Sequence, residues 1–525
     1  MTFGVLAWTV LGSLLRMANT DIQAGWNYHN ATKHSRRSVR TNPHFLDWAN
    51  QPLPFKIYPK LDLIPLSGEL REIDTPVLRT LSEVSHPDNA PPDLQTLTEL
   101  LYFSAGVTRR HTFPGGEIYF RAAACTGALY EIELYFACGP LPDLDAGLYH
   151  FAAGEFGLRR LRAGDFRRVL VEATANEPSL PQAAVIVICT GTYWRNAWKY
   201  QGRTYRHFGW DNGTILANLL AMSTALELPA KVVCGFVDAD VNRLLDLDTE
   251  REVAFSLVSI GRIADLPSAP PAEIAPLRLE TVPLSRREVD YPLMRIMHDA
   301  SSLLTAEEVA NWRGSTLVVN PVEPVGELIP LTPLGNTELP SDSTEQVILR
   351  RGSTRRFARE PISFAELSTI LDRAASGVPA DFLNPFGAQL NDLYLIVNAV
   401  EGLPSGSYFF NGERRALEML KEGDFRSEAG YLGLEQELPA DASVVVFFLA
   451  DLEGIFHRFG NRGYRAVQLE AGIIGGKLYL AAYALHLGAS GLTFYDDDVV
   501  TFFSPHAKGK GAVFLVALGR STKRS

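Results

Sequence analysis

The sequence contains one dense cluster of arginines, around residue 350. Four arginines and a serine lie within seven residues of a chain whose net charge is -11: Arg350, Arg351, Ser353, Arg355 and Arg356. A guanidinium group forms bidentate hydrogen bonds to phosphate oxygens, and a serine hydroxyl adds a neutral donor. The cluster precedes a predicted helix and suits a doubly charged phosphate, although a solvated basic turn explains the same residues. We retain Arg351, Ser353 and Arg355 as candidate phosphate ligands.

Other residue types that often carry chemistry form no recognisable motif. The sequence has no P-loop, no GxGxxG after a strand, no GxSxG and no HExxH. Its four cysteines lack CxxC spacing, so we predict neither a disulfide framework nor a zinc site: Cys125, Cys138, Cys189 and Cys234. We interpret His207 and His457 as structural histidines. We interpret Asp496–Asp498 as a helix N-cap with solvated charges.

Length and composition restrict the class of protein. The chain has 525 residues, more than one hydrophobic core usually serves, so two domains are expected. The acidic balance argues against nucleic-acid or anionic-membrane partners, and unpaired cysteines fit a reducing compartment, so we expect a cytoplasmic protein. The apolar run at residues 3–15 lacks a basic leader and a cleavage site and is too short to span a bilayer. Translation starting at Met17 is the simpler interpretation of that run.

Hydrophobic periodicity predicts the same five elements twice, in the order helix, strand, strand, helix, strand. In the first half these occupy residues 93–106, 127–137, 183–191, 211–228 and 251–261, and in the second half residues 364–377, 390–400, 443–451, 470–488 and 511–519. Residues 25–70 are predicted to wrap over the surface in extended form, because a residue before proline disfavours helix. Residues 264–345 are proline-rich and are predicted to be a linker with at most one short helix, near 305–312.

Matching sequence at a constant offset indicates a tandem duplication. Leu134-Tyr135 matches Leu393-Tyr394, and Tyr205-Arg206 matches Tyr464-Arg465, each at an offset of 259. We therefore predict an α+β chain made of two fused units that form a pseudo-dimer. The predicted segments are an N-terminal extension at 1–75, copy one at 76–263, the linker at 264–345 and copy two at 346–525.

These motifs resemble one branch of a flavoprotein family. RRGSTRRFAREPIS, from Arg350, is similar to the R-R-S-x-R-x-F phosphate motif of the nitroreductase fold. RAAACTGALYEIELY, from Arg121, resembles the R-x-x-P-S-x-G-A-L-Y-P-x-E-L-Y block of the SagB/ThcOx-type branch. Further similar segments are residues 27–35, 45–59, 147–151, 199–207 and 488–500. The resemblance implies tandem units with an antiparallel-rich mixed sheet flanked by helices, in a branch that includes FMN-dependent azoline oxidases.

The resemblance also implies a site divided between the copies. Single-unit relatives are homodimers with FMN at the interface, where one subunit supplies the phosphate arginines and its partner supplies the P-S-x-G block. At an offset of 271, the copies align Arg351, Ser353 and Arg355 with Thr80, Ser82 and Val84 of copy one. Copy one therefore lacks the phosphate charges. Copy one instead keeps the block that contacts the flavin ring: Arg121, Cys125 in place of serine, Thr126 and Gly127. Copy two has Ala380, Asn384, Pro385 and Phe386 at those positions, and a phenylalanine in place of glycine would fill the space.

Three further features complete the implied site. Gly491, Leu492 and Thr493 resemble the segment whose backbone N–H contacts flavin N5. Arg520, with Lys523 and Arg524, is expected to reach the flavin phosphate, although a frayed basic tail explains these residues equally well.

Lys199 and Tyr200 stand where azoline oxidases carry a Lys-Tyr pair implicated in deprotonating the heterocycle, whereas copy two has Arg458 and Phe459. A lysine in an apolar pocket has a lowered pKa and can act as a base, and tyrosine can relay a proton. Without the resemblance, a surface lysine beside a packing tyrosine is the simpler interpretation. With it, we favour Lys199 and Tyr200 as the catalytic pair.

The expected function is an FMN-dependent two-electron oxidation with one flavin per chain, from azoline to azole by analogy. The substrate would be a small or peptide-borne heterocycle, in a chain that acts alone as an intramolecular pseudo-dimer or within a biosynthetic complex. Two alternatives remain open at this level. One is an NAD(P)H-dependent nitro- or quinone reductase, and the other is a flavin-free structural partner in such a complex.

Overall fold

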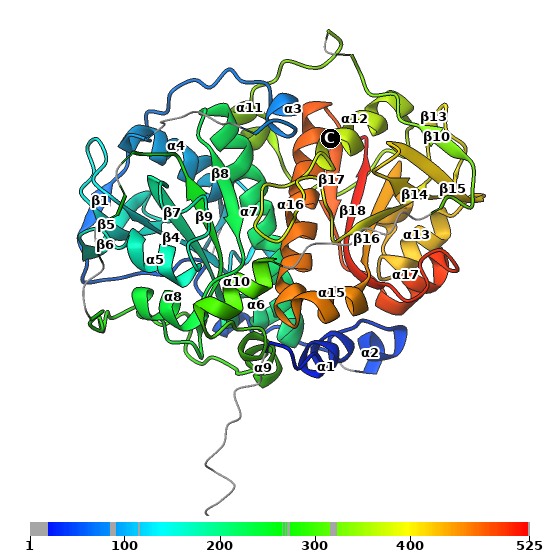
Figure 1. Ribbon diagram of the computed structural model, residues 1–525. Helices are drawn as coiled ribbons and strands as arrows, with labels where there is room; N and C mark the ends of the chain where they lie inside the picture. The colour runs from blue at the N-terminus through cyan, green and yellow to red at the C-terminus, as the bar shows by residue number, and fades with distance from the viewer. Residues whose placement is uncertain are drawn as a thin grey trace, which may run out of the picture.

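Two seven-stranded sheets, one from each half of the chain, flank a central pair of long helices (Figure 1). The computed structural model describes residues 19–41, 43–84, 91–113, 116–264, 266–267, 269, 273–314, 323–335 and 337–522. No helix in these ranges is long and apolar enough to cross a membrane.

The sheets have the same strand order, and every neighbouring pair in them is antiparallel. The first has the order β1-β6-β5-β4-β7-β9-β8, and the second β10-β15-β14-β12-β16-β18-β17. The first comprises β1 (Leu63–Pro65), β4 (Ile132–Cys138), β5 (Gly147–Ala152), β6 (Gly157–Ala163), β7 (Val185–Thr192), β8 (Ala230–Val233) and β9 (Glu252–Ile260). The second comprises β10 (Leu328–Pro330), β12 (Asp392–Val397), β14 (Gly406–Asn411), β15 (Ala416–Glu422), β16 (Val444–Ala450), β17 (Gly488–Gly491) and β18 (Gly511–Gly519). The common order confirms the predicted pair of α+β units.

Two smaller sheets and the helices complete the fold. β11 (Ile362–Ser363) pairs with β13 (Val400–Glu401), and β2 (Val107–Phe113) pairs with β3 (Gly116–Arg121). Helices up to the first unit's end are α1 (Gln23–Ala31), α2 (Arg36–Thr41), α3 (Val77–Thr80), α4 (Leu94–Ala105), α5 (Arg167–Ala173), α6 (Tyr193–Tyr200), α7 (Thr204–Ala225) and α8 (Asp238–Leu245). The rest are α9 (Pro292–Ala300), α10 (Ala306–Gly314), α11 (Thr344–Arg350), α12 (Phe364–Ala374), α13 (Arg426–Leu432), α14 (Glu437–Asp441), α15 (Leu452–Phe459), α16 (Arg462–Ala484) and α17 (Asp496–Phe503).

The central helices α7 and α16 cross at two equivalent glycines. A Cβ atom added to Gly213 would lie 2.5 Å from the backbone of Gly472, and one added to Gly472 would lie 2.5 Å from the carbonyl oxygen of Trp210. Gly213 and Gly472 are 259 residues apart, the offset of the duplication. The pseudo-twofold axis therefore passes through this crossing, where only glycine allows the backbones to approach so closely.

Buried ion pairs connect each central helix to the opposite unit. Arg203 and Arg206 at the start of α7 pair with Asp496 of α17, at N–O distances of 3.1 and 2.6 Å. The equivalent arginines of α16 pair with Asp238 of α8. Burial alone would raise the pKa of Asp496, but Arg203 and Arg206 hold it at about 2. The prediction that Asp496 is a solvated charge was therefore wrong.

The segments outside the predicted units contain more structure than expected. α1 and α2 occupy part of the range predicted to be extended, because its first proline is Pro43 and the X-Pro argument does not reach residues 23–41. The predicted linker holds two helices, α9 and α10, rather than at most one. β1 and β10 are edge strands of the two sheets, and both have the sequence Leu-Ile-Pro. The repeat thus extends into both segments.

The helix crossing predicts a destabilised Gly472→Ala variant. Because the added Cβ meets backbone atoms that cannot move alone, we expect a loss of about 1–3 kcal/mol of folding free energy, measured by urea or thermal unfolding. Gly68→Ala is the matched control, since its Cβ meets no atom within 4 Å. Equal unfolding midpoints for both variants would contradict the crossing.

Candidate active site

The arginine cluster of copy two lies against the ring block of copy one. Arg351 donates hydrogen bonds from Nε to the carbonyl oxygen of Ala122 (3.0 Å) and from Nη2 to that of Arg121 (3.2 Å). The cluster follows the end of α11 and precedes α12 by several residues, so it does not lie at a helix N-terminus as expected. The two motifs thus meet between the units, where the resemblance placed them.

Tyr479 of α16 joins the phosphate cluster to the segment expected to contact flavin N5. Its hydroxyl lies 3.3 Å from Ser353 Oγ and accepts a hydrogen bond from the backbone N–H of Gly491 (2.5 Å). Two residues further on, Thr493 Oγ1 is buried and has no hydrogen-bond partner among the described residues. A buried hydroxyl without a partner at this point is consistent with a polar ligand between the units.

Lys199 and Tyr200, at the end of α6, lie beside both motifs. A Cβ added to Gly127 would lie 2.9 Å from the hydroxyl oxygen of Tyr200, and Gly127 has a positive φ of 64°. Burial lowers the pKa of Lys199, and the charge of Arg355 from copy two lowers it further. Arg355 is exposed and pairs with no carboxylate in the described chain. The structure therefore brings Arg355, Lys199, Tyr200 and Gly127 together.

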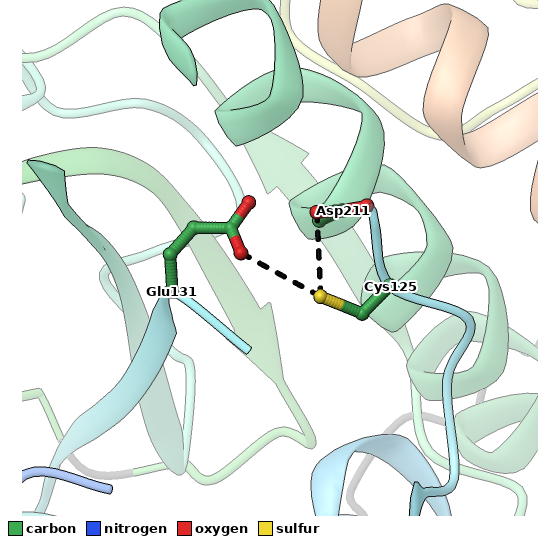
Figure 2. A group of neighbouring side chains, drawn as sticks. All are labelled: Cys125, Glu131 and Asp211. Carbon is green, nitrogen blue, oxygen red and sulfur yellow. Dashed lines mark hydrogen bonds between the residues drawn. The ribbon is translucent and has the colours of Figure 1, made fainter. Parts of the chain in front are cut away.

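The turn at Cys125–Gly127 is held by an acidic side chain of α7, which points toward Cys125 (Figure 2). Asp211 accepts hydrogen bonds from the backbone N–H (2.9 Å) and the hydroxyl (2.8 Å) of Thr126. Cys125 Sγ lies 3.4 Å from an oxygen of Asp211 and 3.5 Å from one of Glu131. Asp211 thus fixes the conformation of the ring block.

The same three side chains form a buried acid cluster. Their ligand-type atoms lie within 4.8 Å of one another. Burial raises the pKa of Asp211, and Glu131 raises it further; burial, Asp211 and Glu131 also raise the pKa of Cys125 well above the usual value. The cysteine that replaces the family serine is therefore a thiol, which does not act as a nucleophile. We interpret the role of the cluster as structural, since Asp211 holds the turn at Thr126.

Several predicted residues lie away from this arrangement. The guanidinium of Arg121 is buried between Phe55 and Tyr130, so only its carbonyl faces copy two. Arg520 bonds the carbonyl of Pro361 and lies 3.4 Å from Glu366, which directs it away from Ser353. Lys523 and Arg524 lie outside the described residues.

The two histidines interpreted as structural differ. His207 is buried, and its Nδ1 lies 2.8 Å from Asn196 Oδ1, as expected of a structural histidine. His457 is exposed on α15, where its nearest acidic partner is Glu453 at 3.8 Å, so that interpretation was wrong.

The pseudo-symmetric second interface is closed by hydrogen bonds between the units. Val232 stands 259 residues before Gly491, and its N–H and carbonyl bond Pro379 and Asp381 of copy two, at 2.8 and 3.0 Å. The carboxylate of Asp381 accepts the backbone N–H groups of Cys234 (2.8 Å) and Gly235 (2.9 Å). At the first interface the N–H groups of Gly491 and Leu492 are also bonded within the protein, to Tyr479 and Leu515. The two interfaces therefore differ at Cys234 and Gly235, the equivalents of Thr493 and Phe494, whose N–H groups are occupied by Asp381.

The phosphate side of the second interface lacks counterparts of Arg351 and Arg355, although Arg373 of α12 donates a hydrogen bond to Ser82 Oγ there (2.8 Å). A small pocket there is lined by Ser82, Val84 and Phe386, among others, and by Lys477. Lys477 is buried, and its ammonium donates to the carbonyl oxygens of Leu81 (2.9 Å) and Gly377 (2.7 Å). The ammonium of Lys477 is therefore bonded to protein carbonyl oxygens, and Phe386 lines the same pocket.

Sequence reasoning missed Asp211, Tyr479 and Asp381. Asp211 had a recognisable signal, because both central helices carry an acid at this position, Asp211 and Glu470, within otherwise apolar sequence. Tyr479 and Asp381 act across the interface, and no local pattern distinguishes them from other core or loop residues.

Comparison with known proteins identifies the family. The model described as the nitroreductase family matches residues 348–520. A protein of Methanocaldococcus jannaschii described as a nitroreductase is 30% identical over 161 residues, which cover 30% of this chain and 81% of that protein. The crystal structure of an Anabaena variabilis protein described as a nitroreductase covers 95% of this chain and 99% of its own, with 27% identity and a TM-score of 0.75.

A weaker structural likeness is a chain of the Escherichia coli microcin synthetase complex. It is 17% identical, covers 46% of this chain and 93% of its own, and has a TM-score of 0.31, too low to carry an argument. The alignment with the Anabaena variabilis protein spans both units, so that protein has the same tandem arrangement along nearly its whole length.

The buried Lys477 predicts a pH dependence of stability. Burial lowers its pKa to about 8, whereas the unfolded value is near 10.4, so the unfolded chain binds the extra proton between these pH values. Stability should therefore rise from pH 8 to 10.5, by at most about 3 kcal/mol. Lys477→Gln keeps a donor to the two carbonyls and removes the titration. Parallel pH profiles of unfolding free energy for the two proteins would contradict the assignment.

The motif matches, the shared strand order and the relatives lead to the same conclusion: this chain belongs to the nitroreductase family.

Proposed function

We propose that the chain is an FMN-dependent oxidoreductase with one flavin site, formed by the phosphate cluster of copy two and the ring block of copy one. The observation that carries this proposal is the asymmetry of the two interfaces. One has Arg351 and Arg355 without carboxylate partners in the described chain and a buried, unpartnered Thr493 hydroxyl. At the other, the backbone N–H groups of Cys234 and Gly235, which are equivalent to Thr493 and Phe494, are bonded to the carboxylate of Asp381.

The residues at the open interface fit FMN. Arg351, Ser353 and Arg355 would hold the phosphate, and the positive φ of Gly127 lets the ring-block backbone approach a flat ring without a Cβ in between. The Gly491–Thr493 segment would face the edge of the ring. When bound, FMN supplies a two-electron acceptor that no side chain can replace.

We further propose oxidation of an azoline to an azole as the reaction. This reaction removes a proton and a hydride from the heterocycle. Lys199 would be the base that takes the proton, and FMN, when bound, would supply the hydride acceptor, with dioxygen as the terminal oxidant. Support comes from Lys199, whose pKa is lowered by burial and by Arg355, and from the adjacent Tyr200. The residues of copy two at these positions, Arg458 and Phe459, have neither function.

A second candidate is reduction of nitro compounds or quinones by NAD(P)H, which the descriptions of the relatives favour. The two reactions differ in the electron donor. Anaerobic loss of flavin absorbance on adding NADPH would favour the reductase, and loss on adding a thiazoline would favour the oxidase.

Arg355→Ala tests the cofactor site. Loss of a charge-assisted hydrogen bond to phosphate, worth about 1.5–3 kcal/mol, should raise the dissociation constant for FMN roughly 10- to 100-fold, measured by fluorescence titration. Arg356→Ala is the matched control, since it removes a neighbouring exposed arginine. If both variants bound FMN like the wild type, the phosphate assignment would be wrong.

Lys199→Met tests the proposed base. Because only the uncharged amine accepts a proton, the wild-type rate on a small synthetic thiazoline should rise with pH through the lowered pKa of Lys199. In the variant the rise of the rate with pH should disappear and kcat should fall about 100-fold, while FMN still binds. A variant that retains the wild-type pH profile would exclude Lys199 as the base.

A further inference from the structure

Copy one carries a β-hairpin that copy two lacks. β2 (Val107–Phe113) and β3 (Gly116–Arg121) form a separate two-stranded sheet. Arg121 follows Gly106 by 15 positions, whereas Ala380 follows the equivalent Gly377 by only three. The inserted hairpin thus occurs only in the unit that supplies the ring block.

The hairpin leads directly into the open interface. Its last residue, Arg121, accepts a hydrogen bond from Arg351 at its carbonyl oxygen. Burial lowers the pKa of Arg351, and the charge of Arg109 on β2 lowers it further, so the base of the hairpin lies near the phosphate cluster. At the second interface, Pro379–Asp381 pairs directly with β8 in the corresponding place.

The two faces of the hairpin have different surroundings. On one face, Tyr119 packs edge-on against Phe55 at 5.0 Å, and Arg110 donates to the carbonyl of Gly154 at 3.4 Å. The cross-strand pairs Arg109–Phe120 and His111–Ile118 lie on the opposite face. Phe113 and Ile118 are each 42% exposed on it. We call this opposite face, formed by Arg109, His111, Phe113, Ile118 and Phe120, the outer face.

The charge of the outer face and the unpaired backbone groups of the hairpin determine which kind of ligand this surface can bind. The outer face carries Arg109 and His111, while the hairpin's acidic residue, Glu117, lies on the other face, bonded to Tyr119 at 2.6 Å. No third strand pairs with β2 or β3 among the described residues, so each has an edge of backbone N–H and carbonyl groups open to pairing. Such an edge binds an extended chain by β-strand addition, which a free heterocycle cannot provide.

We propose that the hairpin docks an extended peptide with acidic and apolar side chains, which carries the reacting heterocycle to the open interface. The peptide backbone pairs with the free edge, its acidic side chains meet Arg109 and His111, and its apolar side chains cover Phe113 and Ile118. The inference rests on the proposed function for the reacting group, but the docking surface is defined by the hairpin alone.

The test is fluorescence anisotropy with synthetic peptides and the FMN-loaded full-length protein. The probe is a labelled ten-residue peptide of alternating glutamate and valine around a central thiazoline. Its counterparts replace glutamate by lysine or methylate alternate backbone nitrogens. We expect the wild type to bind the glutamate peptide at least 10-fold more tightly than either counterpart. Equal affinity for all three peptides would overturn the proposal.

A double charge reversal locates the surface. Arg109→Glu with His111→Glu should weaken binding of the glutamate peptide at least 10-fold and favour the lysine peptide, whereas Arg168→Glu, on the exposed side of α5, should change neither. Unchanged peptide affinity in the double variant would overturn the proposal. Flavin content is measured in parallel. A wild type that takes up no FMN but still discriminates the peptides would contradict the proposed function and leave the docking surface intact.

Discussion

The close crossing of α7 and α16 is the constraint on which the rest of the molecule depends. Gly213 and Gly472 bring the two backbones into contact at equivalent positions, so the units are related by an axis through this point. Everything at the two interfaces follows from it, because residues on opposite sides of the axis can meet only when the helices lie this close. The reciprocal ion pairs of Arg203 and Arg206 with Asp496, and of Arg462 and Arg465 with Asp238, hold the same arrangement at one end of the helices.

Fusion into one chain allows what a symmetric dimer does not. In a homodimer, every substitution that damages one interface damages its twin. Here Asp381 occupies backbone donors at one interface, where Lys477 and Phe386 line a pocket, and none of the three residues has a counterpart of the same type at the other. The open interface keeps its arginines, a glycine with positive φ, and the Lys199-Tyr200 pair. The hairpin β2–β3 also lies beside this interface alone, whereas a homodimer would carry the hairpin in both subunits.

Much of the fold could be predicted, because the information is local. Alternating and helical patterns gave the core strands and α7, α12 and α16, and a constant offset revealed the repeat. The edge strands β1 and β10 were missed because a strand of three residues is too short to show an alternating hydrophobic pattern. Asp496 was taken for a solvated charge because its partners, Arg203 and Arg206, lie almost 300 residues earlier in the chain.

The sequence predicts which copy supplies each motif of the candidate site, but not the contacts that hold those motifs in place. Comparing copies shows which motif each has lost, and the structure brings Arg351 of copy two against the segment of copy one that leads to Cys125. The comparison of copies does not show that Arg121 turns its guanidinium inward, that Arg520 bonds Pro361 instead, or that Asp211 holds the turn at Thr126. These are consequences of packing between segments that are distant in sequence.

The central claim is that two copies make one cofactor site. Isothermal titration of FMN into the flavin-depleted full-length protein tests it most directly, because the stoichiometry does not depend on the substrate. The account predicts one FMN per chain with a single affinity. Two equivalents per chain, or no uptake at all, would contradict it.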